Sequence, residues 1–72
     1  MKRLVNVSES EFSTKWPMGH YLGWQPEYNV HCYIEKRDIG VFHSKYLLEV
    51  EGTEENIQMY IEHLKYIGFK IR

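Results

Sequence analysis

The C-terminal third of the chain, Tyr46–Arg72, constrains the fold more than any other stretch. It reads Y-L-L-E-V-E-G-T-E-E-N-I-Q-M-Y-I-E-H-L-K-Y-I-G-F-K-I-R. The first part has the composition of a strand, which Gly52 ends. Thr53 then occupies an N-cap position, where its hydroxyl can accept a free backbone N–H, and the two glutamates that follow favour the positive end of the helix dipole. The stretch therefore predicts a strand, a turn and a helix.

The predicted helix carries one apolar stripe and has a clear end. Spacings of three and four residues relate the members of the stripe, which are Ile57, Tyr60, Ile61 and Leu64. Gly68 suits the position just after a helix. Phe69 and Ile71 then alternate with charged residues, as in a short strand with one buried face. Burial of each large apolar side chain contributes roughly 1.5–3 kcal/mol, so the stripe is expected to cover a sheet.

A second, smaller apolar pair lies on the same predicted helix. Met59 and Tyr66 are seven residues apart, on a face roughly opposite the stripe, with His63 nearby. Isolated exposed apolar side chains are ordinary on proteins. Two interpretations stay open, namely solvated side chains or a face that binds a partner or a second copy.

The N-terminal stretch predicts a strand and then a short helix. Lys2–Val7 (K-R-L-V-N-V) is rich in β-branched residues, as strands are. Ser8 opens S-E-S-E, a capping box in which the Ser8 hydroxyl bonds the Glu11 N–H and the Glu11 carboxylate reaches back. The helix is expected to end before Pro17, since the residue before a proline disfavours the α conformation.

Residues 17–28 (P-M-G-H-Y-L-G-W-Q-P-E-Y) form the most unusual stretch. Two prolines and two glycines forbid a regular helix, and loops of this length are often functional. The apolar and aromatic residues in and beside it are Trp16, Met18, Tyr21, Leu22, Trp24 and Tyr28. Either they pack into the core in place of a longer first helix, or they form a binding loop for a partner.

The middle of the chain predicts a hairpin. Val30, Cys32 and Ile34 alternate with polar residues within Asn29–Lys36 and share one face. R-D-I-G at 37–40 is expected to turn the chain, and Val41–Glu51 to return as a strand. Within this strand, Tyr46, Leu48 and Val50 are expected to face the core of the protein. The register stays open, because a slip of one residue inverts both faces.

The predicted order is β-α-β-β-α-β, an α+β fold of the ferredoxin-like or split βαβ kind in one domain, 1–72. Its antiparallel sheet is covered on one face by two helices, with a shortened first helix and a long aromatic loop. The other face is open to solvent or to a partner. It is expected to carry His31, Tyr33, Glu35, His43, Lys45, Leu47, Glu49 and Lys70.

Composition bounds the classes of function. A chain of 72 residues has a marginal core, for which self-association is a common remedy, and its aromatic content of 15% favours interfaces. The net charge of −1 provides no basic block for non-specific binding to nucleic acid. Cys32 is the only cysteine, which favours a reducing compartment. No signal-peptide pattern or membrane-spanning run is present, so a soluble cytoplasmic protein is expected.

No pattern of catalytic or metal-binding residues emerges. His20, His31, Cys32 and His43 lack the spacing of a zinc site, and the neighbours His31 and Cys32 point to opposite faces of a strand. Cys32 is expected to be buried and inert. No nucleophile elbow, phosphate-binding loop or H-E-x-x-H motif is present. The sequence therefore predicts no enzyme activity, no metal and no cofactor.

The stretch from Tyr28 to Arg72 resembles the small ferredoxin-fold regulatory domains of the ACT and NIL type. The likeness is closest over Leu47–Ile71, where a strand ending in E-G, an acidic first turn, an apolar helix, L-K-x-x-G and a last strand follow one another. The resemblance implies dimerisation through sheet edges and binding of small effectors such as amino acids. The segment from Ser8 to Tyr28 departs from the pattern, and no functional residue is carried over.

The function predicted is a non-enzymatic binding or regulatory module that acts through protein–protein contacts and self-associates, as an accessory subunit or a phage-type modulator of a larger machine would. The candidate partner-binding residues are Trp16, Met18, Tyr21, Leu22, Trp24, Tyr28, Tyr33, Leu47, Met59 and Tyr66. One alternative is a nucleic-acid-binding module, whose candidate residues are His31, Tyr33, His43 and Lys45. The other is a sensor of a small, amino-acid-like effector.

Overall fold

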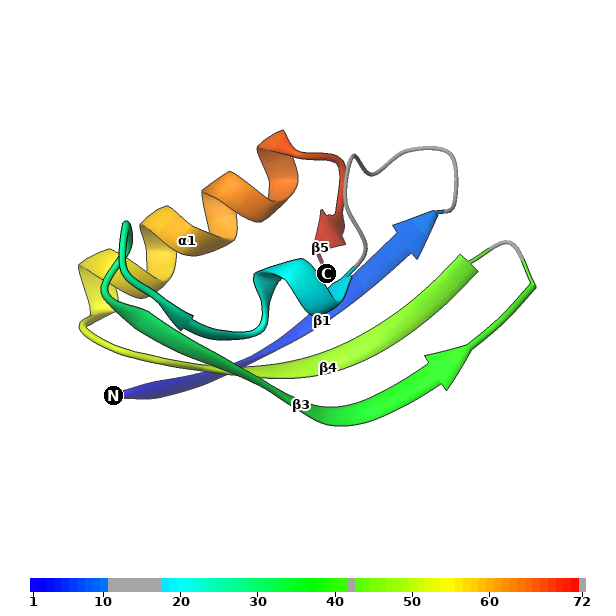
Figure 1. Cartoon of the computed structure of the whole chain (residues 1–72), viewed down its shortest axis with the longest axis horizontal. Helices are drawn as coiled ribbons and strands as arrows, with labels where there is room; N and C mark the ends of the chain where they lie inside the picture. The colour runs from blue at the N-terminus through cyan, green and yellow to red at the C-terminus, as the bar shows by residue number, and fades with distance from the viewer. Residues whose placement is uncertain (11–17, 42, 72) are drawn as a thin grey trace.

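A computed structural model of the protein describes residues 1–10, 18–41 and 43–71. The elements in this part of the chain are β1 (Lys2–Ser10), the 3-10 helix η1 (Met18–Tyr21), β2 (Gly23–Gln25), β3 (Val30–Ile39), β4 (His43–Glu51), α1 (Glu54–Tyr66) and β5 (Lys70–Ile71). The strands form a single sheet in the order β2-β3-β4-β1-β5, and every neighbouring pair is antiparallel. One α-helix lies over one side of this sheet (Figure 1). The predicted α+β class is confirmed.

The C-terminal third folds as predicted. β4 and β5 both run antiparallel to β1, which lies between them, so α1 connects two parallel strands of the sheet. The Thr53 hydroxyl accepts a hydrogen bond from the Asn56 N–H at 3.2 Å and caps the helix N-terminus. The C-terminus closes as a Schellman motif, in which the Phe69 N–H donates to the Leu64 carbonyl at 3.0 Å. Gly68 supplies the φ of 112° that this motif requires.

The core lies between α1 and the covered face of the sheet. The four stripe residues of α1 are buried, and they meet Val5, Val7, Val30, Cys32, Leu48, Val50 and Phe69. Tyr46, Ile34 and Ile71 pack partly buried around this cluster, so the predicted core faces of the three strands are confirmed. The Tyr60 hydroxyl donates a buried hydrogen bond to the Tyr21 carbonyl, which ties η1 to the middle of α1.

The predicted start of an N-terminal helix is wrong. β1 continues through Ser10, and Ser8 pairs with Lys45 while Ser10 pairs with His43. Pairing with the long strand β4 satisfies the backbone groups that a capping box would satisfy, so the local signal at Ser8 is overridden. The rest of that predicted helix, including Trp16, lies outside the described residues.

The predicted structureless loop at 17–28 contains two short elements. Met18 and Tyr21 of η1 are buried in the core. β2 follows and pairs with the start of β3. The turn between these strands is closed by a hydrogen bond from the Tyr28 N–H to the Gln25 carbonyl at 3.2 Å, with Pro26 at its second position.

The predicted hairpin is present, but its turn lies later in the chain than expected. β3 continues to Ile39, so residues 37–39 form strand and not turn. The register shifts by one residue between Ile34 and Lys36, where a bulge inserts an extra residue into β3. Alternation before the bulge therefore follows the prediction, whereas after it Arg37 is the residue opposite Tyr46.

Because the Cys32 thiol is buried, we expect the protein to lose stability at alkaline pH. Burial raises the pKa of Cys32 from 9.0 to about 12, and burial also raises the pKa of Tyr60 above its usual 10.0. Between the pKa of each group in the unfolded chain and its raised pKa in the folded protein, the unfolded chain binds fewer protons than the folded one. Stability therefore falls as pH rises through this range. Each group should lower the free energy of unfolding by up to about 1.4 kcal/mol per pH unit.

Urea denaturation measured from pH 8 to pH 11 checks this expectation. In a Cys32→Ala variant the decline should begin closer to pH 10, where the unfolded tyrosines ionise. A free energy of unfolding that stays flat over this range in the unmodified protein would contradict the burial of both groups.

The hydrogen bond between Tyr60 and Tyr21 predicts a second stability effect. A Tyr60→Phe substitution removes the donor and leaves the buried Tyr21 carbonyl without it, which should cost about 1–3 kcal/mol in urea denaturation. Tyr66→Phe is the matched control, since its hydroxyl lies on a side chain that is 89% exposed. Equal stabilities of the two variants would exclude the proposed role of this bond.

Candidate interaction surface on the open sheet

The strand register determines which side chains share the face of the sheet that α1 does not cover. Directly opposed residues of antiparallel strands point to the same side. One row across the sheet is Trp24, His31, Glu51 and Lys2, and the next is Tyr33, Glu49 and Leu4. A third row, beyond the bulge, is Lys36, Leu47 and Asn6. We call the surface made by these three rows the open face.

Three aromatic rings form a continuous line on the open face, which we call the aromatic row. The ring centroids of Trp24 and His31 are 4.7 Å apart, with planes inclined at 40°. Those of His31 and Tyr33 are 5.9 Å apart and nearly parallel, at 4°. Trp24 is 48% exposed and Tyr33 is 45% exposed, so this line of rings presents a broad apolar area to solvent.

Both apolar side chains and charges of both signs surround the aromatic row. Leu4 is 59% exposed, and Leu47 is half-buried on the same face. The Lys2 Nζ atom lies 4.0 Å from Glu49 Oε1 and 3.9 Å from Glu51 Oε2, so it bridges two carboxylates at the margin of the row. These long contacts at an exposed lysine contribute little to folding. They do place acidic groups next to the rings.

The outermost strands of the sheet are short, and a bulge interrupts the part of β3 that extends beyond β2. β2 and β5, the outermost strands, contain only three and two residues. The bulge beyond Ile34 lies where β3 continues past its pairing with β2. Short edge strands and bulges are the devices by which proteins prevent edge-to-edge association. Among the described residues, β3 after Cys32 and β1 before Val7 have no strand on their outer side.

The structure brings most of the predicted open-face residues together. His31, Tyr33, Leu47 and Glu49 occupy neighbouring rows, and Lys45 lies farther along the same face, opposite Asp38. Lys70 also belongs to this face, because it pairs with Ser8 of β1. Glu35 is exposed at the bulge. The side chain of His43 lies outside the described part of the chain.

The residues proposed as a binding loop separate into different environments. Met18 and Tyr21 belong to the core, and Leu22 and Tyr28 pack half-buried against it. Trp24 differs from Tyr21, Leu22 and Tyr28, because about half of its side chain is exposed. It belongs to the open face. The G-W-Q-P-E-Y-N-V stretch carried a signal for this placement, since Q-P-E-Y is a turn sequence between two short strand-like runs.

The outer side of α1 carries the other predicted contact residues. Met59 is 59% exposed and Tyr66 is 89% exposed, on the side of the helix away from the sheet. They therefore form an apolar surface separate from the open face.

The described residues include side chains of the kinds that bind metals, and one thiol. Within residues 1–10, 18–41 and 43–71 no three His, Cys, Asp or Glu side chains converge as metal ligands would. Cys32 is buried, and burial raises the pKa of its thiol, so it is held in the unreactive protonated form. The one α-helix of the described chain is also too short and too polar to cross a membrane.

Comparison of the chain with protein-family models, with curated proteins and with solved structures found no match. Its function is therefore inferred from the surfaces described above.

Proposed function

We propose that the protein is a small non-enzymatic binding module that self-associates by packing the open faces of two sheets together. The observation that carries this proposal is the aromatic row, together with the exposed Leu4 beside it. Contiguous exposed apolar patches are uncommon on small monomers and usually mark contact sites. Aromatic residues are also the type most enriched at interfaces.

The dimensions of the molecule support a second copy as the occupant of the open face. The protein measures 34 × 21 × 19 Å, so one of its long faces has an area of roughly 700 Å². A standard stable interface buries about 800 Å² per partner. Packing of two open faces would therefore use one whole side of each protomer and come close to the size of a standard interface.

The charges of the open face suit contact with a copy of itself. A two-fold interface brings one patch against the same patch rotated, so a patch with both signs can be complementary to itself. Lys2 and Lys36 lie on the open face with Glu49 and Glu51. A rotated partner can place its lysines against these carboxylates while the aromatic rows pack at the centre.

We also infer a ferredoxin-like topology and a relationship in architecture to small regulatory domains of the ACT and NIL type. The position of β1 between the parallel strands β4 and β5 supports this inference. So does β3, which runs parallel to β1 on the far side of β4. The aromatic row favours dimerisation through the face, whereas those domains use their sheet edges.

Self-association is tested by sedimentation equilibrium. The unmodified protein should show a species of twice the 8.7 kDa chain mass as its concentration rises. A Tyr33→Lys substitution places a charge in the aromatic row and should weaken the dimer at least about tenfold, as loss of a central contact residue does. Tyr66→Lys, the same change on the outer side of α1, should leave the dimer intact.

A monomeric mass at millimolar concentration would rule out this function, and so would equal effects of the two lysine substitutions. Circular dichroism should show both variants folded, since substitutions at exposed sites usually change stability by less than about 0.5 kcal/mol.

The aromatic row also favours a second candidate function, the binding of single-stranded nucleic acid. Rings exposed on a sheet can stack bases, at about 1–3 kcal/mol for each base. Glu49 and Glu51 flank the rings, however, and would repel phosphates. Fluorescence anisotropy with mixed single-stranded oligonucleotides at low salt distinguishes the two candidates, since the self-association account expects no binding at tens of micromolar. Binding that Tyr33→Lys strengthens, or that Tyr33→Ser abolishes, would favour nucleic acid.

A further inference from the structure

We infer that the outer side of α1 is a docking site for a cationic amphipathic helix of a partner protein. This site lies on the opposite side of the sheet from the open face, and its existence does not depend on self-association. It is a shallow hollow of about 840 Å³ whose lining includes Tyr28, Met59, His63 and Tyr66 together with three glutamates of α1.

The spacing of the outer residues of α1 is that of a helix-packing face. Glu55, Met59, Glu62 and Tyr66 succeed one another at intervals of four, three and four residues, so they form one line along the helix. A second helix can pack along such a line by placing its own side chains between them. Met59 and Tyr66 are largely exposed and provide the apolar anchors of this line.

The rings of Tyr28 and His63 lie beside this line of α1 residues, on one flank of it. The ring centroids of Tyr28 and His63 are 4.9 Å apart, and both side chains are half-buried, so their orientation is fixed by packing. Tyr28 also packs edge-on against the buried Tyr60 at 5.5 Å. Tyrosine faces attract the guanidinium of arginine and the ammonium of lysine. This flank can therefore receive the cationic head of a partner side chain.

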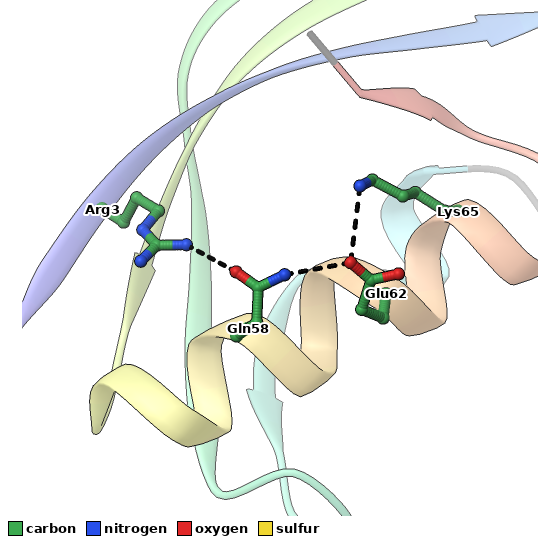
Figure 2. Close-up of polar contacts among 4 residues, drawn as sticks. All are labelled: Arg3, Gln58, Glu62 and Lys65. Atoms are coloured by element: carbon green, nitrogen blue, oxygen red, sulfur yellow. Dashed lines mark hydrogen bonds and ion pairs between the residues drawn. The ribbon is translucent and has the colours of Figure 1, made fainter.

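The charges that line the hollow favour a partner of positive charge. Glu54, Glu55 and Glu62 line it, against the single guanidinium of Arg3. Figure 2 shows that this guanidinium is already engaged: Arg3 Nη1 donates to Gln58 Oε1 at 3.0 Å, and Gln58 Nε2 donates to Glu62 Oε1 at 2.9 Å. Lys65 Nζ lies 3.4 Å from the same Glu62 oxygen.

These contacts leave the carboxylates of the first helical turn available. Among the described residues Glu54 and Glu55 have no ion-pair partner, because the ion pairs of α1 in this part of the chain involve Glu62 and Lys65. A cationic partner therefore gains ion pairs at the N-terminal end of α1 and apolar contacts at Met59 and Tyr66. An anionic partner would meet like charge along the same line.

A second copy of α1 fits this site less well than a cationic helix. Its only lysine, Lys65, is held near Glu62 of its own helix, so two copies would bring mainly glutamates together. Like charges placed in contact across an interface oppose association. In a dimer formed through the open faces, the two α1 helices would lie on the outside, and both docking sites would stay accessible.

The test uses the full chain and two synthetic peptides of roughly 15 residues, about four helical turns. One is an amphipathic peptide of leucine and lysine, and the other has glutamate in place of every lysine. Binding is followed by NMR of ¹⁵N-labelled protein and quantified by fluorescence anisotropy. The cationic peptide should bind in the micromolar range and shift amide signals within Glu54–Tyr66, whereas the anionic peptide should not bind.

Three variants locate the contact. Tyr66→Ser and Met59→Ser should each weaken binding of the cationic peptide about tenfold. Glu55→Gln should weaken it severalfold, and this difference should shrink as salt rises to about 1 M, where the screening length is about 3 Å. Tyr33→Ser, which removes an exposed tyrosine from the open face, is the matched control and should leave the affinity unchanged.

Equal binding of the two peptides would overturn the inference, as would signal changes confined to β3 and β4 or a Tyr33→Ser effect as large as that of Tyr66→Ser. Loss of self-association in Met59→Ser would also overturn it, since the site would then be occupied by a second copy. Monomeric behaviour of the protein in sedimentation would contradict the proposed function and leave the docking site unaffected.

Discussion

The structure depends on the packing of one apolar stripe of α1 against one face of the sheet. Ile57, Tyr60 and Leu64 are fully buried there, and the Tyr60 hydroxyl bonds the Tyr21 carbonyl inside the same contact. The buried residues of the described chain all belong to this one core. Among the described elements α1 covers one face of the sheet, and the open face is the side that this two-layer packing leaves uncovered.

Sequence patterns predicted the parts of the fold in which local and tertiary preferences agree. From Thr53 to Phe69 the N-cap, the stripe and the Schellman end are all local, and the structure contains each of them. At Ser8 the local capping signal disagreed with the pairing of β1 against β4, and pairing determined the structure. The bulge after Ile34 has no local signal of its own, because it depends on how β3 and β4 align.

The open face was predictable where the local alternation of residues agrees with the pairing of the strands. Alternation within β3 and β4 placed His31, Tyr33 and Leu47 on one face, which the register confirms. Trp24 joined this face through β2, a strand of three residues, for which the Q-P-E-Y turn sequence is the one local signal. The protein thus presents an aromatic surface on the sheet and a separate acidic and apolar line on α1.

Isotope-filtered NMR on a mixture of labelled and unlabelled chains tests most directly whether two open faces pack together. In a dimer packed through the open faces, the rings of Trp24 or Tyr33 on one chain should contact the methyl groups of Leu4 or Leu47 on the other. Intermolecular contacts that arise from Met59 and Tyr66, or no intermolecular contacts at millimolar concentration, would contradict it.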